Sequence, residues 1–148
     1  MAFDPRRTPC VGICSTTYGD LVCRGCKRFA HEIVQWNGYS DDQRARVWGR
    51  LDSLRDGCVA EFVAVADLAR LNAALLECRL DRDGQSQSAR IYELLRRRAR
   101  VIADLKEVGL RARKGAIGSA VDIRDAIDAE MLMRSRAAYE HSFHTPVD

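Results

Sequence analysis

Four cysteines near the N-terminus are the feature that most constrains this chain. They stand in the pattern Cys10-x3-Cys14-x8-Cys23-x2-Cys26, so four of the six cysteines fall within seventeen consecutive residues. Two close pairs joined by a short loop are typical of a site in which each pair holds the same metal centre from one turn. We therefore predict that these four residues bind a single centre.

The cellular compartment decides what such cysteines can do. We find no apolar core of a secretory signal in the N-terminal sequence MAFDPRRTPC, and no run of 18 or more residues is free of charge. We therefore expect a cytoplasmic protein without a membrane span. A reducing cytoplasm disfavours structural disulfides and leaves thiolates free for metals or redox chemistry. Ordinary buried cysteines, or a redox Cys-x-x-Cys motif, are the less favoured interpretation.

The residues next to the cysteines suit thiolate ligands. Gly12 and Gly25 lie inside the two pairs, where a residue without Cβ lets backbone N–H groups turn towards sulfur. We also predict a helix from Cys26 to Trp36, whose positive end would favour the Cys26 thiolate. Positive charge that lowers thiol pKa values comes from three further residues, Arg24, Lys27 and Arg28.

The ligand pattern does not decide the identity of the metal. Spacing alone favours zinc, because paired turns are its usual structural site, whereas the common ferredoxin run places three cysteines in quick succession. This chain lacks that run. Zinc and an iron-sulfur cluster are therefore both kept as candidate cofactors.

Several segments around the cysteines are distinctive in combination. They are Pro9-Cys10-Val11-Gly12-Ile13-Cys14, Cys23-Arg24-Gly25-Cys26-Lys27-Arg28, Glu32-Ile33, Trp36 and Ser40-Asp41-Asp42-Gln43-Arg44. Through them, residues 8–56 resemble the bacterial family called domain of unknown function 1289. That family is described as predicted iron-sulfur proteins with four cysteines and has no established activity. The resemblance implies a site without naming a reaction, and it does not extend to residues 57–148.

The spacing of apolar residues predicts a mostly α fold. We expect a small four-cysteine metal-binding head with two short helices over residues 1–56 and a helical body over residues 57–148, containing a long central helix, a helical hairpin and a frayed tail after Phe143. No strand pattern is found beyond what the metal loops themselves could add. The predicted helices run from Cys26 to Trp36, from a capping box at Ser40 to about Leu54, from about Gly57 to Leu80, from about Ser88 to Val108, and onwards from a cap at Ser119.

Two of these helices carry further predictions. The helix over 57–80 is apolar on nearly all sides, so we expect it to be the central packing element. The helix over 88–108 is expected to bury Val101 among its leucines and to end at Gly109. A loose linker is expected over residues 110–118.

The basic stretch over residues 90–114 offers an alternative function. A nucleic-acid surface is one interpretation. We favour internal pairing, in which Arg98 lies on the buried stripe of its helix and meets a carboxylate of the following helix. The candidate partners are Asp125, Asp128 and Glu130.

Three other residues could bind a metal by their chemistry, but we expect them to have structural roles. His31 is close enough to Cys26 to be a substitute ligand, but four cysteines already complete a site, so we expect a packing or surface histidine. Cys58 and Cys78 are expected to be buried, inert thiols on one long helix.

These observations favour a non-enzymatic metal protein that binds a protein partner. The four cysteines form a complete ligand set, and the sequence contains no glycine-rich phosphate loop and no recognisable nucleophile with its base. The first alternative is an iron-sulfur redox or metal sensor, or an electron-transfer protein. The second is an RNA-binding accessory protein that uses residues 90–114.

Overall fold

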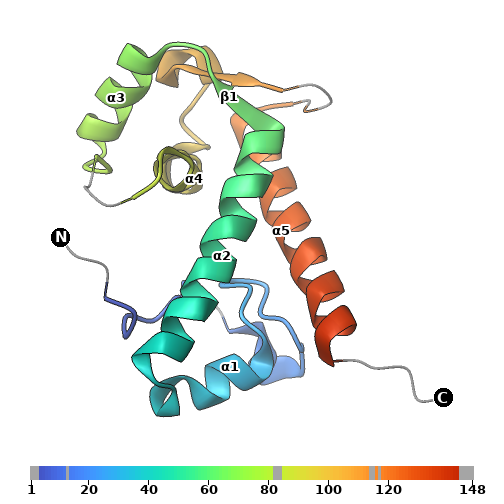
Figure 1. The fold of residues 1–148 in the computed structure, drawn as a ribbon. Helices are drawn as coiled ribbons and strands as arrows, with labels where there is room; N and C mark the ends of the chain where they lie inside the picture. The colour runs from blue at the N-terminus through green and yellow to red at the C-terminus, as the bar shows by residue number, and fades with distance from the viewer. Residues whose placement is uncertain (1–3, 13, 82–84, 114–115, 117, 144–148) are drawn as a thin grey trace. The chain divides into compact units, whose positions relative to one another are not determined.

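The computed structural model describes residues 4–12, 14–81, 85–113, 116 and 118–143. Helices dominate these residues, which confirms the predicted mostly α fold class. In chain order (Figure 1) the elements are η1 (Ser15–Tyr18), α1 (Ala30–Gln35), η2 (Trp36–Gly38), α2 (Asp41–Phe62), β1 (Val63–Val65), α3 (Leu68–Glu77), α4 (Gln87–Arg98), η3 (Leu105–Val108), β2 (Leu110–Ala112) and α5 (Ala120–Phe143), where η marks a 3-10 helix.

The chain forms two compact units. The first, here called the cysteine unit, comprises Phe3–Leu54 and Glu130–Asp148. The second unit comprises Met1–Ala2 and Arg55–Ala129. The division falls within α2 and within α5, so the last part of the chain belongs to the unit that carries the four predicted ligands.

Two helix starts follow directly from local side-chain chemistry. Before α2, Ser40 Oγ accepts from the Gln43 backbone N–H at 3.2 Å, and Gln43 Oε1 accepts from the Ser40 N–H at 2.8 Å. Before α5, Ser119 Oγ accepts from the Asp122 N–H at 3.2 Å and Asp122 Oδ2 accepts from the Ser119 N–H at 2.9 Å. Both predicted caps are confirmed, because each reciprocal pair satisfies backbone donors that the helix cannot satisfy itself.

The inward faces of these two helices carry apolar residues. In the cysteine unit, α2 buries residues that cluster with Trp36: Val47 and Leu51, with Tyr39 and Trp48 packed against them. Along α5 the buried residues include Ile123, Ile127 and Met131. The predicted fraying after Phe143 falls outside the described residues.

The helix predicted from Cys26 begins later. Lys27 has a φ of 67°, in the left-handed region, and α1 starts only at Ala30. A left-handed residue cannot continue a right-handed helix. The prediction that Cys26 lies in the first helical turn is therefore wrong, and the helix end does not explain the state of its sulfur.

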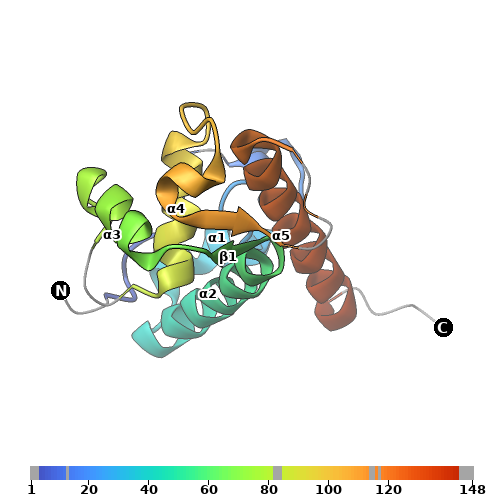
Figure 2. The ribbon, with the colours of Figure 1, turned by 90° about the horizontal axis from the view of Figure 1, so that it is seen from above.

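The single long helix predicted over residues 57–80 is also wrong. Here α2 continues past Leu54 to Phe62 and β1 follows, pairing antiparallel with β2 in the register Val63↔Ala112 and Val65↔Leu110. β-Branched valines suit a strand once a partner is present. A new helix then starts at α3, where Asp67 Oδ1 accepts from the Arg70 N–H at 3.2 Å. Figure 2 shows β1 joining the end of α2 to α3.

The region after α4 departs from a helix as well. α4 ends at Arg98, and the stretch to residue 113 contains η3 and β2, so the basic residues 90–114 do not form one helix and the predicted linker begins with a strand. Val101 is 69% exposed, against the prediction. Arg98 is exposed rather than on a buried stripe, which removes the reason for a carboxylate partner.

Gly109 fixes the junction between η3, β2 and α3. It ends η3 at the predicted place with a φ of 73°, and its carbonyl oxygen accepts from the N–H groups of Ala66 and Asp67 at 2.8 and 3.0 Å. A Cβ at this position would overlap the Asp67 carbonyl oxygen and lie 2.6 Å from the Leu71 nitrogen. Only glycine permits this approach of backbone to backbone.

Across the described ranges, no helix is long and apolar enough to cross a membrane.

We predict that Gly109→Ala lowers the free energy of unfolding by about 2 kcal/mol or more, because it adds both left-handed strain and a backbone overlap. Urea unfolding would measure this. Gly49→Ala is the control, because Gly49 is exposed in α2 with no atom within 4 Å of its added Cβ. That change should stabilise the protein by about 0.5 to 1 kcal/mol. Equal effects of the two substitutions would contradict the proposed junction.

Candidate metal centre

A narrow loop carries the second cysteine pair. Val22 and Phe29 form an antiparallel β-bridge. Inside it, the Cys23 N–H donates to the Arg28 carbonyl oxygen at 2.9 Å and the Lys27 N–H donates to the Cys23 carbonyl oxygen at 3.0 Å. These backbone bonds close residues 22–29 into a turn that presents Cys23 and Cys26.

The end of this loop is anchored by the buried carboxylate of Glu32, which is 5% exposed. Glu32 Oε1 accepts from the Phe29 N–H at 2.8 Å and caps α1. The two terminal guanidinium nitrogens of Arg50, in α2, donate to the same carboxylate at 2.6 Å. The Arg50 guanidinium also lies 4.1 Å from the centre of the Phe29 ring, which meets Tyr139 of α5 edge-on at 5.3 Å. The cysteine loop is therefore fixed to helices from distant parts of the chain.

The first cysteine pair lies in the segment that leads into η1 and is less buried than Cys23. Cys10 is exposed, and its sulfur accepts from the Gly12 N–H at 3.4 Å. Gly12 has a φ of 93°, so the prediction that this glycine turns a backbone donor towards sulfur is confirmed. Cys14 is half-buried, with its sulfur 3.0 Å from the Thr16 hydroxyl of η1.

Cys23 has the most developed thiolate environment. Its side chain is buried, which by itself raises the pKa of the thiol. The backbone N–H groups of Cys26, Ser15 and Gly25 donate to its sulfur and, with the Cys26 side chain, outweigh that effect and lower the pKa to about 7. Hydrogen bonds to the charged form favour it. These donors therefore favour the thiolate, the form that binds metals, in spite of the burial of the side chain.

Ser15 joins the two cysteine pairs. It directly follows Cys14, its backbone N–H donates to the Cys23 sulfur, and its hydroxyl oxygen accepts from the Arg24 N–H at 2.8 Å. These contacts bring the start of η1 against the second pair. Nothing in the spacing of the cysteines identifies Ser15 as the connecting residue.

Cys14 and Cys26 respond electrostatically to Cys23. The Thr16 and Thr17 hydroxyls lower the pKa of Cys14, while negative charge on Cys23 raises it. Burial raises the pKa of Cys26, although the nearby Arg28 guanidinium opposes this. Negative charge on Cys23 thus acts on both of these thiols.

Two buried cations stand beside these sulfurs. Arg28 is 4% exposed; its Nε donates to the Cys26 sulfur at 3.3 Å, and its guanidinium lies 5.0 Å from the centre of the Trp36 ring. Lys27 is 1% exposed, and its Nζ donates to the carbonyl oxygens of Arg24 and Gly25. The sequence predicted positive charge here, but it did not predict that two of these residues are buried.

The donor set fits a metal centre, but the four sulfurs are not gathered around one point. In the part of the chain that the structure describes, no group of three or more His, Cys, Asp or Glu side chains is arranged to hold a metal ion. The Cys23 sulfur accepts from the N–H of Ser15, next to Cys14, and from that of Cys26, whereas Cys10 is exposed. Convergence of all four therefore stays a prediction. The fit rests on the three N–H donors at the Cys23 sulfur, which match what a bound thiolate needs.

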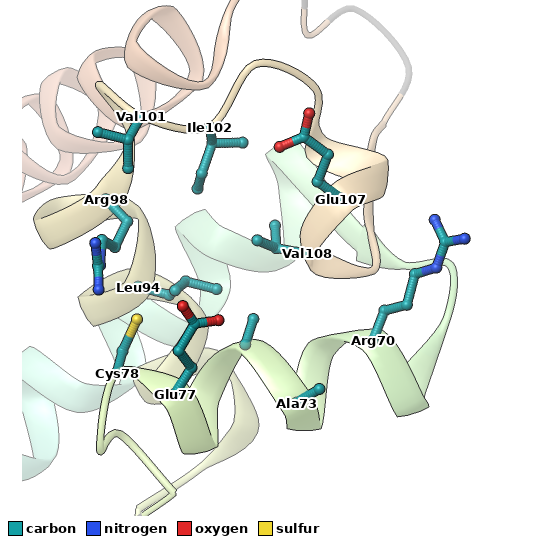
Figure 3. Close-up of a pocket in the computed structure, with 11 residues that line it drawn as sticks. Arg70, Ala73, Glu77, Cys78, Leu94, Arg98, Val101, Ile102, Glu107 and Val108 are labelled. Carbon is teal, nitrogen blue, oxygen red and sulfur yellow. The ribbon is translucent and has the colours of Figure 1, made fainter.

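Three further residues have ligand chemistry: His31, Cys58 and Cys78. The His31 ring is 5.8 Å from that of Phe29. Cys58 is fully buried in α2, as predicted. Cys78, predicted to be buried on the same helix as Cys58, instead follows α3 and lines a cavity of about 380 Å³ in the second unit. Figure 3 shows Cys78 beside Arg98 and Glu77 at one end of this cavity.

Comparison with known proteins gives one finding. Residues 8–55 match the model of a family described as "Protein of unknown function (DUF1289)". This confirms the resemblance of the cysteine segment over about a third of the chain. No curated protein and no solved structure matches the chain. The family description names no activity.

We predict that Glu32→Gln lowers the free energy of unfolding by about 2 kcal/mol, because it leaves a partly buried guanidinium without its countercharge and weakens the α1 cap. Arg50 is 35% exposed, so water offsets part of the loss. Chemical denaturation would measure it. Asp20→Asn is the control in the same unit: Asp20 pairs at 3.3 Å with an Arg24 side chain that is 64% exposed, so the change should cost less than about 0.5 kcal/mol. Similar losses in both variants would count against the anchoring role.

Proposed function

We propose that the chain is a non-enzymatic metal protein in which Cys10, Cys14, Cys23 and Cys26 hold one zinc ion or one iron-sulfur cluster. The observation that carries this proposal is the buried Cys23 sulfur with three backbone N–H donors directed at it. An ordinary buried thiol needs no such set of donors, whereas a thiolate ligand does. A bound centre would supply the positive charge that draws the remaining sulfurs together.

The charge around the site supports the same proposal. Four thiolates with a divalent zinc ion, or with a doubly positive cluster core, carry a net charge of about −2. Lys27 and Arg28 place two buried positive charges next to the second pair. Buried cations are tolerated where negative charge or oriented dipoles compensate them. Because both metals give the same net charge, this argument does not distinguish zinc from a cluster.

We propose that a partner protein binds the surface beside this centre. Tyr18 and Leu21 lie in the segment between the two cysteine pairs and are 91% and 54% exposed. Exposed large apolar side chains, tyrosine above all, are typical of protein interfaces. The metal then acts by folding this segment, because binding energy at such sites is largely folding energy.

We predict that the full chain, purified without oxygen, contains stoichiometric metal and that Cys23→Ser loses it. Elemental analysis and the visible absorption spectrum are the measurements. A colourless protein with zinc identifies a zinc site, whereas a brown, air-sensitive protein with iron and sulfide identifies a cluster and favours the redox or electron-transfer alternative.

Cys58→Ser provides the control for this experiment. Cys58 is also buried, but it lies in the part of α2 that belongs to the second unit. Its replacement should lower stability without removing metal. If Cys23→Ser kept the metal content and melting temperature of the wild type, the proposed centre would be rejected.

A further inference from the structure

Lys27 combines two features that are costly for a lysine. Its side chain is 1% exposed, and its φ of 67° lies in the left-handed region that residues with a Cβ seldom adopt. Burial of an ammonium requires compensation by polar groups, and backbone strain persists only where the surroundings enforce it. The groups that contact the ammonium therefore have to compensate for its burial.

The two contacts of the Lys27 ammonium are the carbonyl oxygens of Arg24 and Gly25, the latter at 3.0 Å. The first carbonyl belongs to the peptide group whose N–H is that of Gly25, and the second to the peptide group whose N–H is that of Cys26. Those two N–H groups donate to the Cys23 sulfur. In a trans peptide the C=O and N–H bonds point in opposite directions. The ammonium therefore holds one end of each peptide group while the sulfur accepts from the other end.

We propose that Lys27 is the positioning residue of the second cysteine turn: its buried ammonium orients and polarises two peptide groups so that their N–H bonds are directed at the Cys23 sulfur. The charge of the ammonium reaches the sulfur through these two dipoles, because a cation at the oxygen end strengthens donation at the nitrogen end. This role rests on the proposed metal centre and specifies how the chain prepares one of its ligands.

The first test uses the metal-free full chain and needs no bound centre. Lys27→Met keeps a long unbranched side chain and the same backbone strain, but removes the ammonium. Lys27→Gly removes both the ammonium and the strain, and so remains informative if the methionine variant folds poorly. The amide proton resonances of Gly25 and Cys26, measured by NMR, should move upfield in both variants because their hydrogen bonds to sulfur weaken. Lys106→Met, at an exposed lysine of η3, makes the same charge change and should leave them in place.

The second test loads the same proteins with Zn²⁺ and measures affinity by competition with a chelator. We expect about a 10- to 100-fold loss of affinity in both Lys27 variants, the range typical when a group that orients a metal ligand is removed. With Co²⁺ as a coloured probe, the sulfur-to-metal absorption bands should shift to lower energy, because a thiolate with fewer hydrogen bonds gives up electron density more readily. A residue that only packs would not shift these bands.

The outcomes separate the two proposals. Unchanged Gly25 and Cys26 resonances in both Lys27 variants would overturn the positioning role. Resonances that move while Zn²⁺ affinity stays within about twofold of wild type would reject that role at the metal centre. A wild-type chain that binds neither Zn²⁺ nor Co²⁺ through its cysteines would reject the proposed function, and the metal-free resonances would still decide whether Lys27 orients the turn.

Discussion

The structure of the cysteine unit depends on the buried carboxylate of Glu32. One of its oxygens caps α1 at Phe29, and both accept hydrogen bonds from Arg50, eighteen residues further along the chain. Arg50 also covers the ring of Phe29. At 5% exposure the carboxylate oxygens need these donors in place of water. This pair fixes the backbone at the end of the cysteine loop.

Above this anchor, arginines connect the cysteine segments to the aromatic residues of the unit. Arg28 stacks on Trp36 at 5.0 Å, and Arg7, just before the first pair, stacks on Trp48 at 5.6 Å. The indole N–H of Trp48 donates to the Arg7 carbonyl oxygen at 3.0 Å. Both ends of the cysteine segment thus rest on one aromatic cluster, where cation–π contacts tolerate partial burial of the charge. Positive charge next to sulfur is in this way built into the packing of the unit rather than added at its surface.

The success of the sequence predictions depended on how local the governing contacts were. The caps at Ser40 and Ser119 were predicted correctly because donor and acceptor lie within three residues of each other. The prediction of one helix over residues 57–80 was wrong because Val63–Val65 pairs with a strand almost fifty residues away. Valine occurs in both helices and strands, so the sequence of this segment does not decide between them. The prediction that Arg98 is buried was wrong because the helix was predicted too long. A helical wheel assigns a residue to the correct face only within the actual helix, and α4 ends at Arg98.

The sequence by itself determined the chemistry of the candidate site: four thiols in two pairs, glycines that turn backbone donors towards sulfur, and basic residues beside them. These are properties of residue type and short spacing, which the sequence displays directly. Only the tertiary structure decided that Ser15 donates across to Cys23, that Lys27 is buried behind the peptides of the second turn, and that Glu32 holds the loop through Arg50. The physical reason is that burial and hydrogen bonding between separated segments depend on where the chain folds back on itself, which residue type and spacing do not specify.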